Sequence, residues 1–188
     1  DKGALCFMLI LYYVSNETKV VSSHFQIGFL HLRALKSKIL VGEDKTTEFK
    51  KTFCLDVKTK TKEKHIIEAC IKTIAAFLNT SGGVLYVGVS DSGDIVGIEE
   101  ELNLLFNNNY DKFLLNFKDK LKTKFKNYLH THIEYNLINA GNKKVLEVNC
   151  TKSKEAVFIN ENDFYVRTNP ATEKLEGKEL LNYTKHRF

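Results

Sequence analysis

Apolar residues recur at helical spacing between residues 63 and 79, and a nearly unbroken apolar run follows a short polar segment. A period near 3.6 predicts an amphipathic helix there. Asn79-Thr80-Ser81-Gly82-Gly83 follows, and glycine suits the left-handed residue that ends a helix. Val84 to Val89 is nearly all apolar, as in a central strand that is buried on both faces. The pattern predicts a helix, a tight turn and a buried strand at the centre of the fold.

The same reading predicts three further helices and several strands. The helices run from Ser22 or Ser23 to about Leu40 and over about 111–129 and 176–187. A short strand at 95–98 is expected after a turn at Ser92-Gly93, and two hairpins are expected to turn at 140–142 and 160–163. Hairpins mixed with helices favour an α+β fold with a mixed sheet over a doubly wound parallel sheet.

A strand is also predicted at Glu48-Phe49-Lys50. Alternate residues of a strand point to opposite faces, so Phe49 is expected to face the core and the two charged residues to share the other face. The HxH pair of His130 and His132 has no cysteine or other histidine nearby in sequence. A polar strand face is therefore favoured over a metal site for this pair.

The first 41 residues carry a different signal. Ala4 to Val14 is continuously apolar, but it is too short to span a bilayer and lacks the features of a signal peptide. We expect a buried strand or helix with no membrane role. We also expect the chain to begin inside a longer protein, with residues 1–41 left from an upstream region and residues 42–188 forming the domain.

The composition fits one globular domain with a core, because 43% of the 188 residues are hydrophobic and only one is proline. Four cysteines are scattered without a CxxC pair, which indicates reduced thiols in a cytoplasmic protein. They are Cys6, Cys54, Cys70 and Cys150.

Positive charge is concentrated in two places, although the overall excess is mild at 28 Lys+Arg against 23 Asp+Glu. One cluster alternates along a loop, and the other follows a predicted helix. Either cluster alone is typical of a solvated face, but two clusters near a group of acids favour a polyanion such as RNA or DNA. The candidate nucleic-acid-binding lysines are Lys58, Lys60, Lys62, Lys64, Lys118, Lys122 and Lys126.

Three acids and a lysine are candidates for metal-assisted phosphodiester chemistry: Glu43, Glu48, Asp91 and Lys50. The three carboxylates suit Mg²⁺ or Mn²⁺, which activates water and stabilises charge on a phosphate, and Lys50 is placed to hold that phosphate. On the residues alone, ion pairs between these glutamates and surface lysines are the favoured alternative. No phosphate-binding loop of the GxxxxGK[ST] type is present, so ATP is not expected as a cofactor.

Four motifs follow one another along the chain: ExxxxEFK (Glu43 to Lys50), AFLNTSGG (Ala76 to Gly83), GVSDSGDIVGI (Gly88 to Ile98) and FYVRTNPATEKL (Phe164 to Leu175). With these motifs in this order, residues 43–188 resemble the Schlafen AlbA_2 domain family. The resemblance implies a nucleic-acid-acting α+β lobe. In similar animal Schlafens the domain cleaves structured RNA such as transfer RNA, with acids at the positions of Glu43, Glu48 and Asp91.

The chain departs from the animal proteins in three respects. It carries the lysine-rich insertion Lys58 to Lys64, it lacks their zinc site, and it has one copy of a domain that they contain twice, so a two-fold homodimer is expected. Arg167 either contacts phosphate or ties a hairpin to the acids, since its planar fork suits both. The expected function is a metal-dependent endoribonuclease. The alternative is a non-catalytic DNA- or RNA-binding module of a larger regulatory or defence protein.

Overall fold

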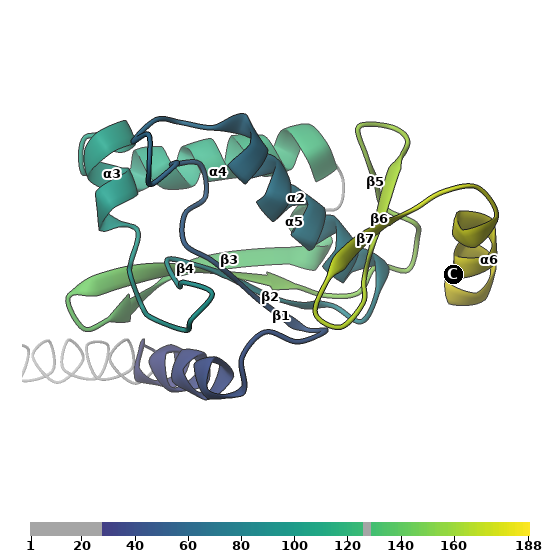
Figure 1. Cartoon of the computed structure of the whole chain (residues 1–188), viewed down its shortest axis with the longest axis horizontal. Helices are drawn as coiled ribbons and strands as arrows, with labels where there is room; N and C mark the ends of the chain where they lie inside the picture. Colours follow the sequence, from purple (N-terminus) through teal and green to yellow (C-terminus); the bar gives the residue numbers. More distant parts are fainter. Residues whose placement is uncertain (1–27, 126–128) are drawn as a thin grey trace, which may run out of the picture. The chain divides into compact units, whose positions relative to one another are not determined.

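The computed structural model describes residues 28–125 and 129–188 (Figure 1). The chain divides into two compact units, residues 1–37 and 38–188. Residues 28–41 are helical, which agrees with the helix expected to end near Leu40. The expected start of that helix, the apolar segment Ala4 to Val14, Cys6 and Lys126 lie outside the described residues.

The described part of the second unit contains seven strands in two sheets. Their order in the larger sheet is β1-β2-β4-β3, with β1 parallel to β2 and the other pairs antiparallel, and the smaller antiparallel sheet is β5-β6-β7. The strands are β1 (Thr47–Lys50), β2 (Gly83–Val87), β3 (Ile133–Ala140), β4 (Lys143–Cys150), β5 (Phe158–Ile159), β6 (Asp163–Arg167) and β7 (Thr172–Leu175). The helices are α2 (Lys64–Asn79), α3 (Glu99–Phe106), α4 (Tyr110–Phe125), α5 (Leu129–His132) and α6 (Gly177–Arg187). The predicted α+β class is confirmed.

Helices α2 and α4 cover the same face of the larger sheet (Figure 1). Each helix directs an apolar stripe inward, because its apolar residues recur every three or four positions. Along α4 the buried stripe is Phe113, Phe117, Leu121 and Phe125. The rings of Phe53 and Phe117 meet edge to face with centroids 4.9 Å apart. No helix in the described part of the chain is long and apolar enough to cross a membrane.

The turn from α2 into β2 depends on two glycines, as the sequence indicated. Gly82 has φ +81°, and its N–H donates to the carbonyl of Phe77 at 3.0 Å. A Cβ on Gly83 would lie 2.5 Å from the Phe77 ring and 2.7 Å from the carbonyl oxygen of Thr46. A side chain at Gly83 would therefore push β2 away from α2 and from the start of β1.

Several predicted elements differ from the structure. Residues 95–98 form only an isolated bridge between Val89 and Ile95, because the N–H groups of Val96 and Gly97 both donate to the carbonyl of Gly88 and form no ladder. Helix α3 was not predicted. The predicted hairpin at 160–163 is present, but β7 extends it to three strands.

The prediction that His130 and His132 lie on a strand was wrong. Both belong to the short helix α5 that precedes β3. His132 Nδ1 lies 3.2 Å from the hydroxyl of Thr151, which follows β4. Cys54, Cys70 and Cys150 are buried free thiols, and burial raises the pKa of Cys70 to about 12. They are structural residues, as expected.

Candidate nucleic-acid-binding site

Strand β1 directs its charged residues toward the helices. Glu48 pairs in register with Leu85 and Lys50 with Val87, and residues paired across strands share a face. Leu85 and Val87 belong to the main core cluster. Phe49 is instead buried on the opposite face beside Tyr86, with ring centroids 6.1 Å apart. The predicted alternation is confirmed, but the expectation that Phe49 would be the residue facing the main core was wrong.

Arg167, at the end of β6, is the centre of a buried polar network. Its residue is only 3% exposed, and its Nη1 donates to Glu48 Oε2 at 2.8 Å and to Thr172 Oγ1 at 3.0 Å. Its Nη2 donates to the carbonyl of Asp44 at 2.8 Å, and the guanidinium lies 5.1 Å from the ring centroid of Phe77. Of the two roles considered for Arg167, the structure shows the tie between the β6–β7 hairpin and the glutamate.

The side chains of Glu43 and Arg167 form hydrogen bonds with the open edge of β1. Among the described strands, β1 pairs with β2 alone. This leaves the outward N–H of Phe49 without a strand partner, while the outward carbonyl of Thr47 accepts from the N–H of Asp44 at 3.1 Å in an isolated bridge. Glu43 Oε1 accepts from the N–H of Phe49 at 2.8 Å, and Arg167 Nη2 donates to the Thr47 carbonyl at 3.4 Å. An unpaired strand edge is a site of unwanted association, so these two residues protect the sheet edge.

Lys50 completes the charge balance of the network. Its ammonium forms a salt bridge with Glu48 Oε1. Burial alone would lower the pKa of Lys50, but the hydrogen bond and charge of Glu48, together with the charge of Glu43, outweigh burial and raise it. Two carboxylates thus face two cations, Lys50 and Arg167. This cluster has no uncompensated negative charge that would require a metal ion.

Asp91 is exposed on the loop after β2. Gly88 and Val89 donate to the carbonyl of Lys50 at 2.8 and 3.3 Å, so this loop leaves the sheet beside the end of β1. Asp91 forms no hydrogen bond or ion pair with Glu43 or Glu48, and nowhere in residues 28–125 and 129–188 do three or more His, Cys, Asp or Glu side chains form a group able to hold a metal. In this arrangement the acids do not fit Mg²⁺ or Mn²⁺, and binding of either ion stays a prediction.

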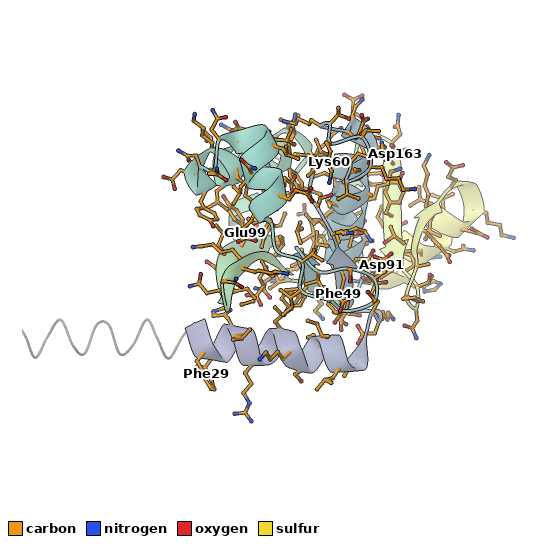
Figure 2. All side chains as sticks on the ribbon, turned by 60° about the vertical axis from the view of Figure 1, so that its left-hand side comes forward. Phe29, Phe49, Lys60, Asp91, Glu99 and Asp163 are labelled. Carbon is orange, nitrogen blue, oxygen red and sulfur yellow. The ribbon has the colours of Figure 1, made fainter. Side chains whose placement is uncertain are left out.

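The lysine-rich loop lies in the helix layer and away from these acids. The segment between β1 and α2 crosses from the sheet to the helices (Figure 1), and Figure 2 shows Lys60 well above Asp91. Lys60 pairs with Glu100 on α3, Lys62 donates to Asn116 Oδ1 on α4 at 3.0 Å, and Lys58 is exposed. The lysines of α4 belong to the same layer, and among them Lys118 and Lys122 are exposed.

Sequence reasoning missed two buried polar side chains that satisfy backbone groups of distant segments. Asn79, 0% exposed, donates to the carbonyls of Val157 and Tyr165 at 2.8 and 2.9 Å and accepts from the N–H of Val157 at 2.8 Å. Glu101 accepts from the N–H groups of Phe53 and Cys54 at 3.0 and 2.6 Å. The only signal was a polar residue inside an apolar helical stripe.

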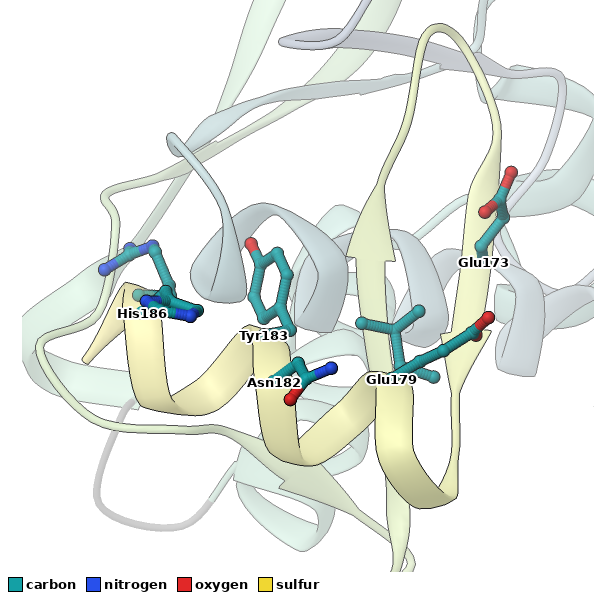
Figure 3. A pocket seen from close by; sticks show the side chains of 7 residues that line it. Glu173, Glu179, Asn182, Tyr183 and His186 are labelled. Carbon is teal, nitrogen blue, oxygen red and sulfur yellow. The ribbon is translucent and has the colours of Figure 1, made fainter.

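Helix α6 completes the end of α2, where the carbonyls have no partner within the helix. Tyr183 Oη donates to the carbonyl of Asn79 at 2.9 Å, and Arg187 Nη2 donates to the carbonyl of Thr80 at 2.7 Å. Beside these contacts, an open pocket of about 740 Å³ lies between β7 and α6. Glu173 and Glu179 lie at one end of it and His186 at the other (Figure 3). This mixed charge does not suit a phosphate backbone.

Lys50→Met should reduce stability at neutral pH by about 1.5 kcal/mol, the scale of a hydrogen bond between charged groups. The folded-state pKa of Lys50 is raised, so its contribution is fully present below the unfolded value of about 10.4. The contribution is lost as pH rises through the folded-state pKa. Urea denaturation of both proteins from neutral to strongly alkaline pH checks this, and a stability difference that widens with alkalinity would contradict it.

A model of the Schlafen AlbA_2 family matches residues 43–176, more than half of the 188 residues. The chain belongs to the Schlafen AlbA_2 family. The resemblance read from the four motifs is thereby confirmed, and the family is one of nucleic-acid-binding domains. The expected start of the domain at residue 42 stays a prediction.

The Schlafen AlbA_2 domain is also similar to a solved structure. This is the crystal structure of the DIP2311 protein from Corynebacterium diphtheriae, with a TM-score of 0.52 and 16% sequence identity. The match covers 76% of this chain and 28% of that chain, so the domain corresponds to a minor part of DIP2311. At this identity the likeness shows the fold alone. No curated protein matches the chain.

Proposed function

We propose that this Schlafen AlbA_2 domain is a nucleic-acid-binding module that holds RNA by its backbone and does not cut it. One observation carries the proposal: Glu48 uses both carboxylate oxygens inside the fold, on Lys50 and Arg167. Glu43 likewise accepts from the backbone of β1. Two of the three candidate catalytic acids are therefore engaged within the fold, Glu48 in ion pairs and Glu43 at the sheet edge, while the lysines remain on the surface of the helix layer.

The lysine-rich surface of the helix layer supports the binding half of the proposal. Ammonium groups that neutralise phosphates release counterions from a nucleic acid, and this term supplies most of sequence-independent affinity. Such contacts recognise shape and backbone and do not read bases. The domain would supply this affinity to a larger regulatory or defence protein, and a two-fold dimer would extend the surface.

A metal-dependent endoribonuclease is the second candidate. It is favoured by family membership and by an acid at each of the positions of Glu43, Glu48 and Asp91. In that function Glu48 would have to exchange Arg167 or Lys50 for another partner when RNA binds. The candidate thus requires a rearrangement of a buried ion pair, which makes it testable.

We expect labelled transfer RNA to bind the protein intact, with or without Mn²⁺. The affinity for transfer RNA should fall about 10-fold or more as salt rises from low to physiological concentration, even if only a few phosphates are contacted. More contacts would make the fall steeper. Gel electrophoresis of the RNA and fluorescence anisotropy of the complex, on the same samples, report cleavage and binding separately.

Asp91→Asn is the matched variant, because Asp91 is exposed and its loss disturbs no buried group. It should leave binding unchanged. Mn²⁺-dependent cleavage that disappears in Asp91→Asn would establish the endoribonuclease instead. Affinity that does not change with salt would exclude a nucleic-acid backbone as the partner.

A further inference from the structure

A small groove separates the first half of α2 from the last turns of α4. Its volume is about 120 Å³, below the roughly 300–1,000 Å³ of sites that enclose a whole small molecule. Three lysines, one from α2 and two from α4, surround a floor of two isoleucines. The lining residues are Lys64, Ile67, Glu68, Ile71, Lys120, Thr123 and Lys124.

The lysines of α4 fall on two flanks of that helix. Successive residues are about 100° apart around a helix, so Lys118 lies about 160° from Lys120, and Lys122 about 160° from Lys124. Lys120 and Lys124 line the groove beside α2. Lys118 and Lys122 lie on the other side of the buried stripe that contains Leu121. Helix α4 thus carries two pairs of lysines of equal charge, one pair beside the groove and the other on open surface.

The groove has the chemistry to hold a phosphate. Lysine stems pack along apolar surface while their ammonium groups stay at the rim, and Ile67 and Ile71 provide that surface here. Glu68 pairs with Lys64 at 3.4 Å, so three positive charges and one negative charge leave a net excess of two. Attraction to an anion is stronger beside low-dielectric side chains than in open water.

We propose that this α2–α4 groove binds the phosphodiester backbone of a nucleic acid, through Lys64, Lys120 and Lys124. The inference rests on the proposed function and deepens it. It moves the principal contact of α4 away from the flank of Lys118 and Lys122, which the sequence favoured. The groove accommodates one phosphate at a time, so a strand would cross it and would not enter it.

Two double variants of the full chain test the location, with labelled transfer RNA as the probe. Lys120→Gln with Lys124→Gln should weaken binding about tenfold and reduce the slope of log affinity against log salt by about two. Lys118→Gln with Lys122→Gln removes the same charge from the same helix and should weaken binding less than about twofold. All four lysines are exposed or half-exposed, so thermal melting should show that both double variants are about as stable as wild type.

A third variant reverses the sign of the effect. Glu68→Gln removes the carboxylate of the groove and should tighten binding about threefold, since repulsion of the phosphate is lost. Equal losses from the two lysine pairs, or no gain from Glu68→Gln, would overturn the groove while leaving nucleic-acid binding in place. A wild-type protein that fails to bind transfer RNA even at low salt would overturn the proposed function itself.

Discussion

Arg167→Met should lower the free energy of unfolding by about 3–5 kcal/mol. Removing one partner of a buried ion pair costs about that much, because the other charge stays desolvated with less compensation. Glu48 is 8% exposed and would lose its 2.8 Å partner, although Lys50 would remain. The carbonyls of Asp44 and Thr47 would also lose one donor each, although each keeps a backbone N–H donor from the other residue. Urea denaturation followed by circular dichroism measures the change.

Arg33→Met is the matched control, because Arg33 is exposed on a helix and should change stability by less than about 0.5 kcal/mol. The double variant Glu48→Gln with Arg167→Met should cost less than the sum of the two single variants, because the side chains interact directly. A loss below about 1 kcal/mol in Arg167→Met would contradict the network. Such a small loss would favour the alternative prediction, in which Arg167 contacts phosphate.

Asn79→Ala should lower the free energy of unfolding by a similar amount, about 3–5 kcal/mol. The amide of Asn79 satisfies both backbone groups of Val157 and the carbonyl of Tyr165. Each buried polar group left without a partner costs about 1–3 kcal/mol. Asn79→Asp should be at least as damaging, because it replaces a donor to two carbonyls by a negative charge. Thermal and urea denaturation check both variants.

Asn182→Ala provides the comparison for this prediction, since Asn182 is exposed on α6. It should leave stability within about 0.5 kcal/mol of wild type. If Asn79→Ala were equally mild, water would have to replace the amide at all three backbone groups. The role of this residue in the AFLNTSGG motif would then not be structural.

Local sequence patterns predicted most of the helices and strands, because the signals for each element lie in residues that are close together in sequence. The apolar period of α2, the glycines after it and the apolar run of β2 are all local signals. The alternation of Glu48, Phe49 and Lys50 fixed which side chains share a face. It did not fix which face α2 would cover, because that depends on the register between β1 and β2.

The roles within the candidate site were harder to predict for the same reason. Arg167 is 119 residues from Glu48 in sequence, and Asn79 is 78 residues from Val157. A motif names such residues without showing whether they meet a ligand or each other. Helical spacing likewise grouped Lys118 with Lys122, but only the packing of α4 shows that Lys120 and Lys124 border α2.

The contacts of α6 with the end of α2 bear on where this domain stops. The family match ends at residue 176, one residue before α6 begins. Yet Tyr183 and Arg187 provide the donors that the last carbonyls of α2 lack. A boundary drawn by similarity thus cuts through the hydrogen bonds of the central helix. The compact unit, residues 38–188, thus extends beyond the part that matches the family model.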